Sequence, residues 1–134
     1  MPVVKAETLA IQSSTDVVQV RQRVRAITIE LGFSLVDQTK MVTAASELAR
    51  NTLEHGGGGE VRIEVLQEVV RRGIRLIFED QGPGIVDMKL ALTDGYTTGS
   101  GMGLGLSGSK RLVNEFDIVS KPGEGTRVTI ARWK

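Results

Sequence analysis

The stretch EDQGPGI, residues 79–85, has residue types that suit ligand binding at the end of a strand. It follows the alternating run 74–78, which is typical of a strand with one buried face. Reversing the chain needs only one or two residues that tolerate a positive φ. A turn does not need a carboxylate, and it does not need two glycines beside one. Glycine lets another group approach the backbone closely, so this combination suits a bound ligand. We therefore expect Asp80 to face a ligand, with Gly82 and Gly84 leaving room for it.

Glu47 and Asn51 form a second pair of candidate site residues, within an expected helix over residues 36–54. At 100° per residue, these two side chains lie within about 40° of each other. Leu48 and Met41 fall on the other side of the helix and are expected in the core. A carboxylate and a carboxamide one turn apart most often form a solvated face. Glu47 and Asn51 would belong to a binding site only if the glycine-rich segments lie next to them in the fold.

Most of the 16 glycines are clustered at 56–59, 82–84 and 95–108, with a smaller contribution near 123–125. Each cluster lies at the edge of an expected helix or strand, which suggests that the backbone approaches another group closely there. A flexible linker is the plain alternative for 95–108. Met102, Leu104 and Leu106 argue against it, because linkers rarely carry this many apolar side chains.

Other motif readings of the same residues are weaker. Residues 103–108 satisfy G-x-G-x-x-G, but a Rossmann fingerprint follows a strand, and here YTTGS precedes it. The segment also nearly matches a P-loop, yet Lys110 would be misplaced in G-x4-G-S-K. His55 is the sole histidine, so no metal site or catalytic triad can be built on it. We expect it to cap the C-terminus of its helix, where the dipole favours positive charge.

The elements that would position these residues follow from periodicity and capping signals. They are an edge strand at 4–11, a helix begun by the run 13–16 and ended by Gly32, the helix 36–54, strands at 61–65 and 74–78 joined by a turn at 71–73, a helix from 103–105 to about 114, and a terminal hairpin. The strands alternate charged with apolar residues, so one sheet face is wet and helices cover the other. This predicts an α+β fold, a two-layer α/β sandwich with a mixed, mostly antiparallel sheet.

Composition limits the functional classes. We expect the 134 residues to form a single domain, 1–134, and 17 basic against 16 acidic residues give a net charge of +1. That balance offers no electrostatic case for binding nucleic acid or an anionic membrane. The absence of cysteine excludes disulfides and thiolate chemistry. The N-terminal residues lack the pattern of a signal peptide, so we expect a cytoplasmic protein.

Three segments in order resemble the motifs of one family. SELARNTLEHGGGG resembles the N-box helix of the GHKL (Bergerat-fold) ATPases, EDQGPGI resembles their G1 box, and GSGMGLGL resembles their G2 box. The likeness spans about residues 40–113. Within the family, the sequence is most similar to the RsbT-type serine/threonine switch kinases of stressosomes, related to the anti-sigma-factor kinases. The resemblance implies a Bergerat fold that binds ATP and Mg²⁺.

The resemblance also implies roles for individual residues. Asp80 would accept a hydrogen bond from the adenine amino group, with Gly82, Gly84 and Ile85 against the base. Asn51 would coordinate Mg²⁺, and Glu47 would take or orient the proton of the acceptor hydroxyl. The remaining expected nucleotide contacts are Thr98 in the lid (with Thr97), the G2 residues Gly101, Met102, Gly103, Leu104 and Gly105, and the countercharges Arg50 and Lys110.

Only fifteen residues, 86–100, separate Ile85 from Gly101, with an expected short helix at 87–93. We expect neither the extra domains of gyrase or Hsp90 nor a phosphoacceptor-histidine hairpin, because the 134 residues leave no length for them. The resemblance therefore implies a protein serine/threonine kinase acting on STAS-domain scaffold or antagonist proteins, which then binds a PP2C-type phosphatase. Open alternatives are an anti-sigma-factor kinase that sequesters a sigma factor, a detached histidine-kinase-like ATPase domain, and a nucleotide-binding module without transfer activity. The wet sheet face, with Arg62, Arg75 and Arg127, is a candidate docking surface.

Overall fold

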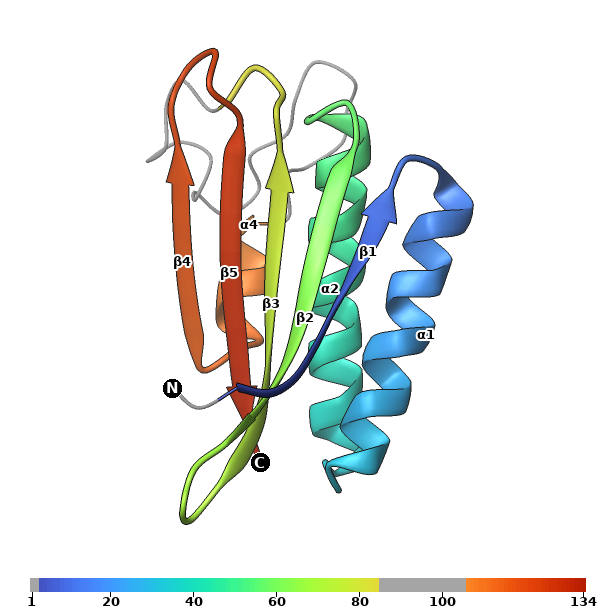
Figure 1. The fold of residues 1–134 in the computed structure, drawn as a ribbon, viewed down its shortest axis with the longest axis vertical. Helices are drawn as coiled ribbons and strands as arrows, with labels where there is room; N and C mark the ends of the chain where they lie inside the picture. The colour runs from blue at the N-terminus through green and yellow to red at the C-terminus, as the bar shows by residue number, and fades with distance from the viewer. Residues whose placement is uncertain (1–2, 85–105) are drawn as a thin grey trace.

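The chain folds into two layers, a five-stranded sheet and the helices that cover one face of it. A computed structural model describes residues 3–84 and 106–134. Its elements are β1 (Val3–Ile11), α1 (Ser14–Glu30), α2 (Leu35–Glu54), β2 (Gly59–Gln67), β3 (Arg72–Asp80), α4 (Leu106–Arg111), β4 (Glu115–Ser120) and β5 (Thr126–Trp133). In Figure 1, α2 and α4 lie behind the strands, and α1 lies beside α2 next to β1. None of these helices is long and apolar enough to cross a membrane.

The strand order is β1-β2-β3-β5-β4, which places β1 at one edge, as expected, and β4 at the other. The expected α+β sandwich is confirmed. All four pairings among the described strands are antiparallel, so this part of the chain shows no parallel pair of the kind a mixed sheet would contain. The register places Asp80 opposite both Gly59 of β2 and Thr126 of β5. The end of β3 is therefore enclosed by two strands.

The ends of the two long helices follow the expected signals. The side chain of Ser13 accepts a hydrogen bond from the Asp16 N–H at 3.3 Å, which caps α1. Ser34 caps α2 through the Asp37 N–H at 3.1 Å. Gly32 has a φ of 82°, a value that glycine adopts readily, and it reverses the chain between the helices.

The hydrophobic core lies between the helices and the covered sheet face. On α1, Val20, Val24 and Ile27 are buried as their spacing predicts. From the sheet, Leu76 and Phe78 point into the same cluster. Alternate residues of these strands point to the open face, so the sheet separates a dry side from a polar one.

Two boundaries differ from the sequence-based expectation. The expected turn at 71–73 lies earlier, because the connection from β2 to β3 is 68–71 and is closed by a 2.8 Å hydrogen bond from the Glu68 N–H to the Arg71 carbonyl. Gly73 lies within β3, where the Trp133 ring packs so closely that a Cβ would not fit. The third helix ends at Arg111 rather than near Asn114. Asn114 is already tied to β5, since its N–H donates to the Ala131 carbonyl at 2.9 Å.

Candidate functional site

Asp80 is the last residue of β3, and its half-buried carboxyl group is held by the turn that follows. The Gly82 N–H donates to its Oδ1 at 2.9 Å. Burial raises the pKa of the Asp80 carboxyl, and backbone hydrogen bonds from Gly82 and Thr126 offset part of that rise. A fixed, partly desolvated carboxylate of this kind is a strong acceptor for a ligand's N–H group.

Glycines enclose Asp80 on two sides. Gly56 lies so close to the carboxyl group that an added Cβ would overlap Cγ of Asp80. Gly125, with a φ of 81°, packs against the Asp80 carbonyl in the same way. A Cβ on Gly82 would lie 2.7 Å from Cα of Gly56. Gly82 therefore lies close to the backbone of Gly56. A contact between Gly82 and an adenine base stays a prediction.

The C-terminal end of α2 carries the second group of expected site residues. His55 occupies the C-cap position, and its backbone N–H donates to the Asn51 carbonyl at 2.9 Å; a capping role for its imidazole stays a prediction. The Gly56 N–H donates to the same carbonyl at 3.1 Å. Gly56 thus bonds to Asn51 through its N–H while it lies against Asp80. The last turn of α2 and the end of β3 meet at one end of the molecule, the upper end in Figure 1.

The side chain of Asn51 has an unsatisfied polar group. Its Nδ2 atom is buried and has no hydrogen-bond partner among residues 3–84 and 106–134. Burying an amide without a partner is costly, so this side chain suits a bound ligand. A half-turn of the carboxamide exchanges its nitrogen and oxygen, so either atom could be directed to the ligand. The amide therefore fits a role as one of the few protein ligands that Mg²⁺ on a nucleotide takes.

Glu47 and Arg50 are paired with each other. Arg50 Nη1 lies 3.2 Å from Glu47 Oε1, an i,i+3 ion pair in which both side chains are about a third or more exposed. Glu47 therefore projects from α2 one turn before Asn51, as the helical spacing predicts, while Leu48 is buried in the core. The sequence suggested both charged residues separately and did not suggest their pairing.

The α4 segment supplies Lys110, which is exposed, while Leu106 and Ser109 are buried. The other expected nucleotide contacts lie outside the described residues and stay predictions. They are Ile85, Thr97, Thr98, Gly101, Met102, Gly103, Leu104 and Gly105. The expected helix at 87–93 and the expected start of the third helix also lie there.

A cavity of about 450 Å³ adjoins Asp80 where the GGGG tract meets β2 and β3. Glu60 and Glu79 line it together with Asp80, and Gln12 closes one side. Three carboxylates would repel a triphosphate. This cavity is therefore unsuited to the phosphate end of a nucleotide.

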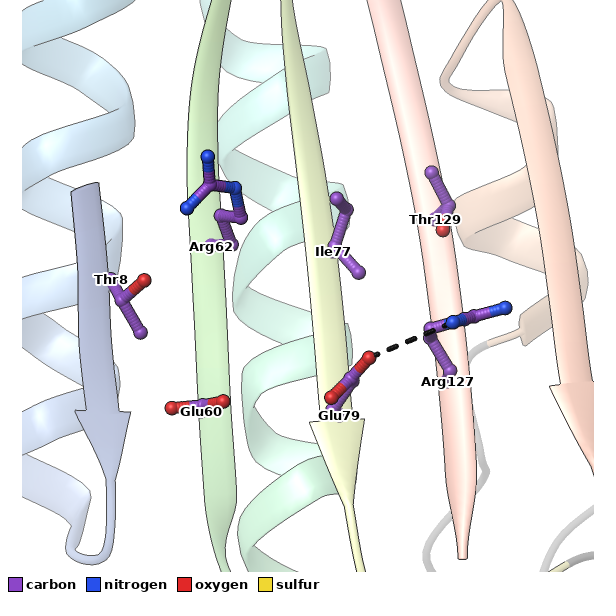
Figure 2. A pocket seen from close by; sticks show the side chains of 7 residues that line it. All are labelled: Thr8, Glu60, Arg62, Ile77, Glu79, Arg127 and Thr129. Carbon is purple, nitrogen blue, oxygen red and sulfur yellow. Dashed lines mark ion pairs between the residues drawn. The ribbon is translucent and has the colours of Figure 1, made fainter. Parts of the chain in front are cut away.

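The open sheet face holds a separate hollow of about 360 Å³, which Figure 2 shows. Arg127 approaches Glu79 at 3.9 Å across it. Beside the hollow, Glu64 accepts hydrogen bonds from Arg62 at 3.0 Å and Arg75 at 2.5 Å. Each basic residue of the expected docking surface therefore has an acidic neighbour. That surface stays a prediction.

Glu64 is almost fully buried on this face. Burial alone would raise its pKa, but the hydrogen bonds and charges of Arg75 and Arg62 outweigh burial and hold the pKa below the ordinary value. Glu64 is therefore charged when the protein is folded at neutral pH.

Comparison with known proteins identifies the family. The model of the histidine kinase-, DNA gyrase B- and HSP90-like ATPases matches residues 36–134. The chain belongs to this ATPase family. The resemblance seen in the three glycine-rich motifs is thereby confirmed, and so is the fold that it implies.

Two curated members of the ATPase family are similar over most of the chain. The serine/threonine-protein kinase RsbT of Bacillus subtilis (strain 168) is 44% identical over 123 residues, which cover 92% of each chain. An anti-sigma F factor of Clostridium novyi (strain NT) is 31% identical over 119 residues, covering 84% of this chain and 82% of its own. Among solved structures, the RsbU and RsbW domains of a Mycobacterium tuberculosis protein match with a TM-score of 0.65 at 21% identity. That match covers 98% of this chain and 33% of the other, and it supports the fold alone.

Proposed function

We propose that this protein is an ATP-dependent protein serine/threonine kinase that acts by partner switching. The observation that carries the proposal is the pair of contacts made by Gly56. Gly56 lies against the carboxyl group of Asp80, and its N–H donates to the carbonyl of Asn51, whose buried amide nitrogen has no hydrogen-bond partner among the described residues. The 44% identity to a serine/threonine-protein kinase over 92% of both chains supports it.

Asp80 selects adenine in this proposal. Its carboxylate accepts a hydrogen bond from the exocyclic amino group, whereas guanine would present a carbonyl oxygen there and be repelled. The half-burial of Asp80 and its fixation by Gly82 support this role. Gly82, Gly84 and Ile85 border the base.

Asn51 holds Mg²⁺, which neutralises phosphate charge when it is bound. The buried amide nitrogen, which has no hydrogen-bond partner in the described part of the chain, supports this assignment. Lys110 and Arg50 supply countercharge to the phosphates, together with Thr98 and the G2 segment 101–105. A cytoplasmic location agrees with the use of ATP.

Glu47 acts as the general base. The acceptor hydroxyl oxygen forms a bond to the γ-phosphorus, the bond from that phosphorus to the bridging oxygen breaks, and ADP leaves. Glu47 takes the hydroxyl proton as this bond forms. Its position one turn before Asn51 and its solvent-accessible carboxylate support the role, and its ion pair with Arg50 restrains the carboxylate on that side of α2.

The proposed acceptors are STAS-domain scaffold or antagonist proteins, and a PP2C-type phosphatase is the proposed partner bound afterwards. A second candidate is an anti-sigma-factor kinase that sequesters a sigma factor, which the 31% identity to an anti-sigma F factor favours.

Phosphate transfer from radiolabelled ATP tests the proposal. The protein is incubated with Mg²⁺, ATP and each STAS-domain protein encoded in the same genome, with Asp80→Asn as the control. We expect label on a serine or threonine of one STAS-domain protein, and none with Asp80→Asn. Capture assays with sigma factors separate the two candidates, since only the second requires a stable sigma-factor complex. Absence of transfer to every STAS-domain protein would contradict the kinase proposal.

A further inference from the structure

Exposed apolar side chains gather at one end of the molecule, the lower end in Figure 1. Nine large apolar residues of the described chain are exposed, and seven of them lie there. They come from the start of β1 (residues 3 and 4), the last turn of α1 (residue 29), the first turn of α2 (residues 35 and 36) and the connection between β2 and β3 (residues 69 and 70). Single exposed apolar residues are ordinary, but a group of them at one place indicates an interaction site.

Val69 and Val70 are the most exposed of these residues. Their relative exposures are 103% and 89%, so neither side chain belongs to the core. Turns favour glycine, proline, asparagine and aspartate and have no need of β-branched apolar residues. Neither folding nor turn formation therefore explains the two valines.

The backbone that presents these valines is held in place. The Glu68 N–H donates to the Arg71 carbonyl at 2.8 Å, and Arg71 Nε donates to Oε1 of Glu68 at 2.8 Å. The Arg71 guanidinium also stacks on the Trp133 ring, 3.7 Å from its centroid. A surface that is already ordered loses less entropy when a partner binds.

The hollow beside the valines is positively charged. It has a volume of about 410 Å³ and is lined by residues 67–72 and Lys134, which we call the hairpin surface. Three of these side chains are basic, and only that of Glu68 is acidic. Glu68 is paired with Arg71, whereas Arg72 and Lys134 form no ion pair with residues 3–84 or 106–134. Unpaired cations next to apolar side chains favour a partner that carries carboxylates.

Lys134 connects the hairpin surface to the helices. Its N–H donates to the Arg72 carbonyl at 2.9 Å. Its Nζ would lie 3.2 Å from a Cβ on Gly32, which is between α1 and α2. The exposed residues at the start of α2 therefore lie on the same side of the molecule as the hollow.

We propose that the hairpin surface binds a segment of a partner protein that carries both apolar and carboxylate side chains. The apolar side chains cover Val69 and Val70. The carboxylates pair with Arg72 and Lys134. An anionic membrane fits less well, because lipid binding of this kind uses clusters of about four to eight basic residues.

Binding at the hairpin surface leaves the nucleotide site open. Arg72 begins β3 and Asp80 ends it, so the two sites are roughly 26 Å apart. A partner can therefore stay bound at the hairpin surface while ATP occupies the other end. This binding does not depend on the proposed kinase activity.

Selection of peptides displayed on phage tests the hairpin surface. Random peptides of about 12 residues, which span roughly 40 Å when extended, are selected on the full chain after depletion on the double variant Val69→Ser, Val70→Ser. We expect enriched peptides that combine apolar residues with an excess of aspartate and glutamate. The most enriched peptide is then synthesised, and its affinity is measured by fluorescence anisotropy.

Charge-reversed variants test the roles of the two cations. We expect Arg72→Glu and Lys134→Glu each to weaken binding of that peptide at least about tenfold, because each replaces an attraction with a repulsion. Lys121→Glu, an exposed charge reversal at the nucleotide end of the sheet, is the control and should bind the peptide as wild type does. Circular dichroism verifies folding of every variant.

Several outcomes would overturn the proposal: no enrichment beyond the depleted library, enriched peptides without acidic residues, or equal affinities of the charge-reversed variants and the control. Binding to vesicles of phosphatidylcholine and phosphatidylserine that the double serine variant loses would also overturn it, because the valines would then contact a membrane. An oligomer of the chain that the double serine variant dissociates would do the same, since it would assign the valines to a contact between copies.

Discussion

Gly56 lies so close to the carboxyl group of Asp80 that a Cβ at position 56 would overlap it and force one of the two residues to move. This contact joins the C-terminal end of α2 to the end of β3. It also couples Asn51 to Asp80, because Gly56 donates a hydrogen bond to the Asn51 carbonyl. The expected metal ligand and the expected adenine acceptor are therefore positioned by one glycine.

Gly56→Ala should disturb the site through this contact. The methyl group must displace either Asp80 or the end of α2, which typically costs about 1–3 kcal/mol. We expect ATP affinity, measured by calorimetry, to fall at least about tenfold. Gly108→Ala is the matched control, because a Cβ there meets no atom of residues 3–84 or 106–134 within 4 Å and the residue lies in a helix. That variant should bind ATP as wild type does and be equally or slightly more stable.

Asp80→Asn should abolish or severely weaken ATP binding without unfolding the protein. It removes the charge-assisted hydrogen bond to adenine. Because burial raises the pKa of Asp80, the ionised carboxylate is less stable in the folded than in the unfolded chain, and this cost is present when the pH exceeds the folded-state pKa. At pH 7 the variant should therefore unfold at an equal or higher temperature. Glu79→Gln, the same change one residue earlier, should bind ATP normally, and unchanged affinity in a folded Asp80→Asn protein would remove Asp80 from the adenine role.

Glu64 should make stability depend on pH in the acid range. Its pKa is lowered in the folded state, so its contribution is fully present above the ordinary glutamate pKa of about 4.3 and is lost as the pH falls through the folded-state value. Urea denaturation between about pH 3 and pH 7 measures this. We expect Glu64→Gln to lower the free energy of unfolding by about 1–3 kcal/mol at pH 7 and to flatten the profile. Glu79→Gln is again the control, because its ion pair at 3.9 Å is exposed.

Local signals in the sequence predicted much of the fold. Ser13 and Gly32 mark the ends of α1 through hydrogen bonds and φ values that neighbouring residues alone determine. Contacts between distant segments could not be predicted in this way. Gly73 resembles a turn residue, yet it serves the packing of Trp133, sixty positions later. Alternation predicted a wet Glu64, whereas Arg62 and Arg75 close over it and leave it 5% exposed.

In the candidate site, too, local features could be predicted and contacts between distant segments could not. Helical geometry was enough to place Glu47 and Asn51 on one side of α2. The contact of Gly56 with Asp80 was not predicted, because it depends on how α2 packs against the sheet. The GGGG tract was visible, but it was interpreted only as a helix end with backbone close to some other group.

Asn51→Ala should separate metal-dependent from metal-independent binding. We expect ATP affinity in Mg²⁺ to fall far more than ATP affinity in EDTA, since only the former uses the amide oxygen. Thr43→Ala, an exposed position on the same side of α2, is the control and should change neither affinity. Equal losses with and without Mg²⁺ would mean that Asn51 has a structural role.

Glu47→Gln should separate the chemical step from binding. Glutamine keeps the shape and most of the hydrogen bonding of glutamate but cannot take up the hydroxyl proton. We expect the variant to bind Mg-ATP and its acceptor protein nearly as well as wild type, yet to transfer phosphate at least about a hundredfold more slowly, the usual contribution of a positioned base.

The ion pair between Glu47 and Arg50 makes a further control necessary. Glu47→Gln also releases Arg50, so a slow variant could reflect a displaced guanidinium instead of a lost base. Arg50→Gln removes the cation and keeps the Glu47 side chain, so it measures the loss of the guanidinium alone, including the countercharge that Arg50 supplies to the phosphates. If Glu47 is the base, Glu47→Gln should be slower than Arg50→Gln. A different view is that transfer is nearly dissociative and that positioning dominates. Single-turnover rates with the true acceptor decide, because a Glu47→Gln rate within a few-fold of wild type would leave Glu47 as an orienting or structural residue.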